Sequence, residues 1–81
     1  MNKTTFPCYR KLKNGKSFYK ISSERTFTEI QCVGNQYFKI EIIANKYPEI
    51  ILIQDMLNKR GIYEISTEEE FNTIEDKLAD K

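Results

Sequence analysis

The residues with the clearest chemical potential are lysines and aromatics that alternate near the N-terminus. The stretch from residue 7 to residue 22, PCYRKLKNGKSFYKIS, places four lysines around two aromatic rings on one face of a hairpin. Ammonium groups follow phosphates and rings stack on bases, so such a face is typical of a sheet that binds single-stranded nucleic acid. Lysine is also the usual solubilising residue of exposed strands. The candidate binding residues are Tyr9, Lys11, Lys13, Lys16, Phe18 and Lys20.

This sequence contains few residues that are suited to catalysis. There is no histidine, which removes Ser-His and Cys-His nucleophile pairs and the commonest general base at neutral pH. Asp55 and the scattered glutamates show no spacing that predicts paired carboxylates, and the three glycines do not form a nucleotide-binding loop. The two cysteines match no zinc-ligand pattern. We therefore expect a non-enzymatic protein without a metal, a cofactor or a small-molecule substrate.

Length and composition indicate one small domain that spans residues 1–81. No apolar run approaches the roughly 20 residues of a membrane span, and the N-terminal MNKTTFPC has no apolar signal core. Cys8 and Cys32 are most simply reduced thiols that act as small apolar side chains on strand faces. We expect a cytoplasmic protein without membrane contact. The abundance of Lys, Asn and Ile is compatible with a phage or another mobile element.

The charges are distributed unevenly along the chain. Residues 1–22 carry six basic side chains and no acidic one, whereas residues 64–81 carry seven acidic and two basic side chains. The three glutamates at 68–70 are explained by the preference of a helix N-terminus for negative charge. The acidic end is also suited to a basic partner. Alternatively, the basic hairpin and the acidic helix face each other, within the fold or across a dimer.

The first predicted element is a β-hairpin over residues 7–22. Asn14-Gly15 between two alternating runs is a strong hairpin signal and predicts a two-residue loop. That loop pairs Cys8 with Ile21 and Lys11 with Phe18. The face expected to join the core then holds Cys8, Arg10, Leu12, Tyr19 and Ile21, and the candidate nucleic-acid residues lie on the other, exposed face.

A second hairpin is predicted over residues 25–44, with its turn at Gly34-Asn35. A two-residue loop places polar Gln31 opposite Phe38 on the best apolar face. A three-residue loop over residues 34–36 places apolar side chains on the same face of both strands, and we expect this register. It pairs Cys32 with Phe38, Ile30 with Ile40 and Thr28 with Ile42.

The apolar run Ile50–Ile53 permits two interpretations. Pro48, Glu49 and a basic pair before Gly61 are helix boundary signals and favour a helix over residues 48–59. Three isoleucines in four residues favour a buried strand over residues 49–54 instead. We expect the helix.

Two further elements close the chain. Alternation over residues 61–65 predicts a short strand. Ser66 and Thr67 each precede a glutamate by three residues, which is the capping-box pattern, and Phe71, Ile74 and Leu78 recur at helical spacing. These signals predict a helix over residues 67–79.

The sequence as a whole predicts an α+β domain. We expect a four- to five-stranded antiparallel sheet, built from two hairpins and a short strand, with both helices packed on one face. The favoured function is a protein-interaction module that binds a protein partner or self-associates through its exposed sheet face; the alternative is nucleic-acid binding. The outward apolar residues expected on that face are Tyr9, Phe18, Tyr37 and Ile43.

Overall fold

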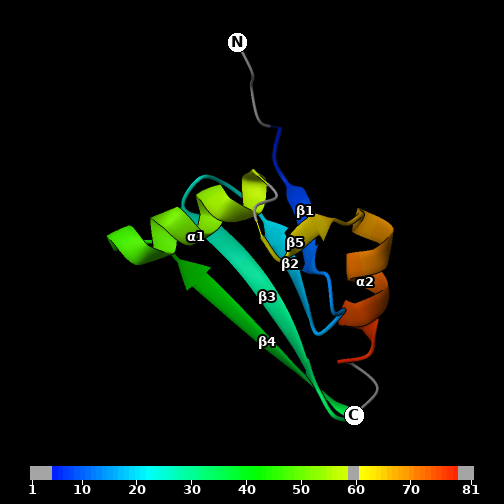
Figure 1. The fold of residues 1–81 in the computed structure, drawn as a ribbon. Coiled ribbons are helices and arrows are strands. Elements are labelled where there is room, and N and C mark those ends of the chain that lie inside the picture. The colour runs from blue at the N-terminus through cyan, green and yellow to red at the C-terminus, as the bar shows by residue number, and fades with distance from the viewer. Residues whose placement is uncertain (1–4, 59–60, 79–81) are drawn as a thin grey trace.

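The computed structural model describes residues 5–58 and 61–78. It contains an open antiparallel sheet of five strands and two helices, which confirms the predicted α+β class (Figure 1). The strand order is β4-β3-β2-β1-β5, so the last strand pairs with the first. The elements are β1 (Cys8–Leu12), β2 (Ser17–Ile21), β3 (Thr26–Val33), β4 (Gln36–Ile43), α1 (Tyr47–Leu57), β5 (Tyr63–Ile65) and α2 (Glu68–Asp76).

Helix α1 forms from the segment that also fitted a buried strand. Pro48 lies in its first turn, where no intrahelical amide is needed, and Ile53 and Met56 are buried against the sheet. Its C-terminal end receives a basic side chain from another element, because Arg10 Nε donates a hydrogen bond to the Met56 carbonyl at 2.8 Å. The basic pair expected at this end, and position 59 of the predicted helix, lie outside the described residues.

Helix α2 begins as the capping pattern predicts. Thr67 is the N-cap, and its Oγ1 accepts a hydrogen bond from the Glu70 amide at 3.1 Å. Phe71 is the buried residue of the helix, and Ile74 and Leu78 pack beside it. Position 79 of the predicted helix lies outside the described residues.

The two helices lie on opposite faces of the sheet, in contrast to the single covered face expected from the sequence (Figure 1). Successive residues of β2 point to opposite faces, so Tyr19 and Phe18 enter different cores. The α1-side core consists of Tyr19, Ile21, Phe27, Ala44, Ile53 and Met56. The α2-side core consists of Phe18, Ile30 and Phe71.

The first hairpin has the predicted register but a longer loop. Cys8 pairs with Ile21 and Lys11 with Phe18, as expected. The strands end at Leu12 and Ser17, so four residues form the connection instead of the expected two. The Gly15 amide donates a hydrogen bond to the Leu12 carbonyl at 2.9 Å, and Gly15 adopts φ +76°, which places the turn one residue earlier than predicted.

The second hairpin adopts the register that the sequence analysis disfavoured. Val33 pairs with Gln36, Gln31 with Phe38, and Glu29 with Ile40, so the loop has two residues and the three-residue prediction is wrong. The reason is that both faces of the sheet carry a helix. Apolar residues of β3 therefore need not share one face with those of β4, and Ile30 joins the α2-side core while Ile40 points to the other side.

Candidate functional site

The aromatic rings of the predicted nucleic-acid face lie inside the protein. Phe18 is only 7% exposed and belongs to the α2-side core. Tyr9 is half-buried and packs on Phe71, with ring centroids 5.8 Å apart. Helix α2 covers this face, so neither ring offers a stacking surface to a base.

The four lysines of the same prediction are separated by the fold. Lys11 Nζ lies 2.9 Å from Glu70 Oε2 and 3.8 Å from Glu64 Oε1. Lys13 and Lys16 are exposed in the β1–β2 loop, and Lys20 is half-buried on β2. The alternative in which the basic hairpin faces the acidic helix within the fold is therefore observed at Lys11.

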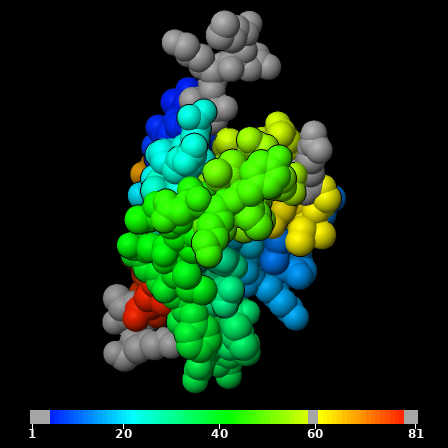
Figure 2. All heavy atoms as spheres, turned by 90° about the vertical axis from the view of Figure 1, so that its left-hand side faces the viewer, coloured from blue at the N-terminus to red at the C-terminus, as the bar shows by residue number. Residues whose placement is uncertain are grey.

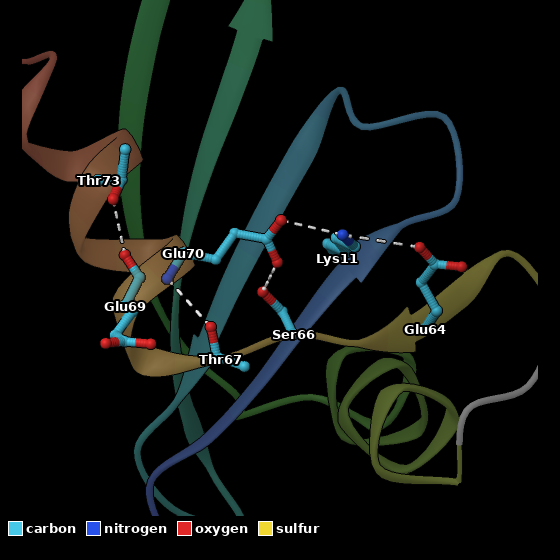
Figure 3. A network of polar contacts seen from close by, with 7 residues as sticks. All are labelled: Lys11, Glu64, Ser66, Thr67, Glu69, Glu70 and Thr73. Atoms are coloured by element: carbon cyan, nitrogen blue, oxygen red, sulfur yellow. Dashed lines mark hydrogen bonds and ion pairs between the residues drawn. The ribbon is translucent and has the colours of Figure 1, made fainter.

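Glu70 connects the start of α2 to the sheet (Figure 3). Its carboxylate accepts hydrogen bonds from Ser66 Oγ and from Lys11 Nζ. These two donors, Ser66 first and Lys11 second, hold the pKa of the Glu70 carboxyl below its usual range. The charges of this region thus stabilise the docking of α2.

Replacing Glu70 by glutamine is expected to lower the free energy of unfolding at pH 7 by about 0.5–1 kcal/mol, because water screens a carboxylate that is 37% exposed. A lowered pKa in the folded state stabilises the protein above the ordinary carboxyl pKa, and this contribution disappears as the pH falls through the folded value. Urea denaturation at neutral pH and near pH 3 measures it. The difference between wild type and variant should shrink in acid; a constant difference would contradict the assignment.

An exposed apolar surface remains on strand β4. Phe38 and Ile40 lie on the same face as α1 but beyond its cover, with 45% and 38% of their surface exposed. Ile42, nearer to the helix, is half-buried against the α1-side core. Ile43 points to the α2 side and is 65% exposed. We call these three exposed side chains, Phe38 and Ile40 on the α1 side and Ile43 on the α2 side, the β4 surface. In Figure 2 the green atoms of β4 lie uncovered beside the yellow-green atoms of α1.

The outer edge of β4 is an unpaired edge of the sheet, since no strand in the described part of the chain lies beyond it. The Cys32 amide donates a hydrogen bond to the Lys16 carbonyl at 2.8 Å. The backbone N–H and C=O groups of even-numbered β3 residues therefore point toward β2, and those of odd-numbered residues point toward β4. Phe38 and Ile40, which oppose odd-numbered β3 residues, therefore direct their amides inward. The residues with outward N–H and C=O groups are Tyr37, Lys39, Glu41 and Ile43.

A row of polar side chains borders the β4 surface on its inner side. Glu29 Oε2 accepts hydrogen bonds from Ser17 Oγ at 3.1 Å and from Gln31 Nε2 at 3.2 Å. Burial, and secondarily the Glu29 charge, raise the pKa of the neighbouring Tyr19 hydroxyl. An apolar centre with a satisfied polar border is the usual anatomy of a protein-binding patch.

Two hollows are found on the part of the chain that the structure describes. A hollow of about 230 Å³ beside α1 is lined by Glu24, Arg25, Ile50, Ile53, Gln54 and Leu57. It is smaller than the roughly 300–1,000 Å³ typical of ligand pockets. The second hollow, of about 370 Å³, is at the low end of that range and lies beside the ends of β3 and β4, where its lining residues are Ser22, Thr26, Phe27, Thr28, Glu41, Ile42 and Ile43. Within residues 5–58 and 61–78, no three His, Cys, Asp or Glu side chains cluster as metal ligands. Neither described helix is long and apolar enough to cross a membrane.

The sequence analysis assigned the residues of the β4 surface unevenly. Ile43 was expected to point outward, and it does. Phe38 and Ile40 were expected in the core, because the alternating run looked like the best apolar face of the sheet. The signal that could have placed them is Gly34-Asn35, a dipeptide typical of two-residue hairpin loops.

Comparisons with known proteins identify no relative of this chain. No protein-family model matches the chain, and no curated protein and no solved structure shows significant similarity to it. Function is therefore inferred from the geometry of the chain itself.

Proposed function

We propose that this chain is a small non-enzymatic protein-interaction module that binds a protein partner through the β4 surface. The observation that carries the proposal is the position of Phe38 and Ile40, which are large, apolar and exposed on a sheet face next to an unpaired strand edge. Large apolar side chains exposed on one face, as Phe38 and Ile40 are, favour association with another protein. The free cysteines Cys8 and Cys32 fit a reducing compartment, and we place the module in the cytoplasm.

Nucleic-acid binding is the weaker alternative. It depended on rings and ammonium groups that share one exposed face, and Phe18 and Tyr9 instead contribute to the α2-side core. Lys13 and Lys16 remain exposed in the β1–β2 loop. Two lysines without a stacking ring support only weak, salt-sensitive contact with phosphates.

The proposal predicts that the double variant Phe38→Ser with Ile40→Ser loses association while it keeps its fold. Removing two large apolar side chains from the centre of a protein interface typically weakens binding more than tenfold. Self-association is measured by sedimentation, and binding of other proteins by affinity capture from the native host followed by titration of each purified candidate. Circular dichroism and thermal melting check the fold.

The matched control is Ile62→Ser with Ile65→Ser. Both isoleucines are also exposed, but they lie at the opposite edge of the sheet, at β5. This variant should associate like wild type. The proposal fails if wild type neither self-associates nor binds a protein, or if the control variant loses binding and the β4 variant does not.

A further inference from the structure

Strand β4 has the length and exposure of an edge that can accept another strand. It comprises eight residues, whereas the opposite edge strand, β5, has three. Short edge strands resist pairing with other chains, and long apolar ones promote it. We propose that the partner is a second copy of this chain, whose β4 pairs antiparallel with β4 to give one continuous sheet; this inference rests on the proposed function and identifies its partner.

The direction of the backbone groups restricts how two copies of β4 can pair. In an antiparallel pair about a two-fold axis, residues with outward N–H and C=O groups must oppose one another. On β4 these are the odd-numbered residues. A shift of one residue would oppose outward and inward groups and exchange the two faces of the strand. The allowed registers therefore differ by steps of two residues.

One of these registers places each charged residue of β4 opposite a residue of opposite charge in the second copy. When Ile40 opposes Ile40 of the second copy, Lys39 faces Glu41 of the second copy. By symmetry Glu41 faces Lys39 of the second copy, so the dimer contains two pairs of opposite charge. Directly opposed unlike charges stabilise an antiparallel pair, and like charges destabilise it. The charge order along the strand is thus complementary to itself.

The neighbouring registers lack this match. A shift that centres the dimer on Lys39 places two lysines opposite each other, and a shift that centres it on Glu41 places two glutamates opposite each other. Each arrangement opposes like charges at the centre of the new strand pair. The register centred on Ile40 is therefore favoured over both.

The same register also gives an apolar neighbour to each residue of the β4 surface. The two-fold axis is perpendicular to the sheet, so the α1-side faces of both copies become continuous. On that face the centre of the dimer is Ile40 against its own copy. Phe38 pairs with Ile42 on the same face, and Tyr37 pairs with Ile43 on the α2-side face; each pair is formed twice.

Existing contacts of the monomer are compatible with this arrangement. Lys39 Nζ lies 2.8 Å from Glu75 Oε2 of α2, and a lysine has three donors, so it can bond to Glu41 of the second copy as well. Both helices pack on the faces of the sheet and leave the outer edge of β4 open. Dimerisation would therefore need no rearrangement of the described core.

Charge exchange at positions 39 and 41 tests the register. Sedimentation equilibrium should show a dimer for wild type. For Glu41→Lys the dissociation constant of the dimer should rise about tenfold or more, because the new lysine faces Lys39 of the second copy at two places in the dimer. Lys39→Glu alone should be weakened similarly because it opposes glutamates. An equimolar mixture of the two variants restores both unlike pairs and should form a heterodimer. Glu24→Lys, an exposed glutamate in the β2–β3 connection and outside β4, is the control and should dimerise like wild type.

A proline tests the backbone pairing independently. Glu41→Pro removes an outward amide, and proline is tolerated on an edge strand where the N–H faces away from the sheet. The variant should stay folded by circular dichroism and lose the dimer. Wild type that remains monomeric up to its solubility limit overturns the inference, as does a dimer that survives Glu41→Pro or a mixture that does not associate. If a monomeric wild type binds another protein through Phe38 and Ile40, only this inference fails and the proposed function stands.

Discussion

Replacing Ile30 by aspartate is expected to leave the protein largely unfolded at 25 °C, whereas the same replacement at Ile40 should leave it folded. Ile30 is fully buried in the α2-side core beside Phe18 and Phe71. A carboxylate buried there without a partner costs several kcal/mol, which is comparable to the total stability of a small domain, about 5–15 kcal/mol. Ile40 is 38% exposed, so an aspartate there keeps contact with water.

This pair of variants also tests the register of the second hairpin. The three-residue loop would place both isoleucines opposite each other on one buried face, and both aspartate variants would then unfold. In the observed register only Ile30 is buried. Far-ultraviolet circular dichroism and urea denaturation distinguish the outcomes. A folded Ile30→Asp protein with a cooperative transition would contradict the burial of this side chain.

Replacing Phe71 by alanine is expected to lower the free energy of unfolding by about 3–5 kcal/mol, the usual cost of removing a large ring from a core. Phe71 is 1% exposed and contacts the rings and aliphatic groups of Tyr9, Phe18 and Ile30. It is the buried side chain of α2, so its removal leaves the helix without its main apolar contact to the sheet.

Urea denaturation followed by circular dichroism measures this loss. Phe71→Leu is the control, because leucine keeps most of the apolar volume and should cost much less, about 1.5 kcal/mol or below. A loss below about 1 kcal/mol for Phe71→Ala would mean that α2 does not cover the sheet, and Tyr9 and Phe18 would then be exposed as the sequence analysis expected.

Local sequence signals predicted most of the elements. Asn14-Gly15 set the register of the first hairpin, and Thr67 with Glu70 predicted the start of α2. Pro48 correctly favoured the helix α1 over a strand. These signals succeed because a turn, a cap or a helix start depends on a few neighbouring residues with special backbone or side-chain preferences.

The candidate site was less predictable because it depends on which face each helix covers. The outer face of the first hairpin is covered because α2 packs over Phe18, and Ile40 is exposed because α1 does not extend over it. Alternation of apolar and polar residues shows that the two faces of a strand differ, but it does not show which face a helix will cover. The exposed surface of this protein is therefore a consequence of tertiary packing.

The central strand β2 has a consequence for how the protein fluctuates. Phe18 points to one core and Tyr19 and Ile21 to the other, so β2 stays covered on one face when a single helix detaches. Partial opening of α1 and of α2 are then separate local events, each of lower free energy than global unfolding. Amide hydrogens of β2 should exchange with solvent only when the whole domain opens, while those of each helix report its own detachment.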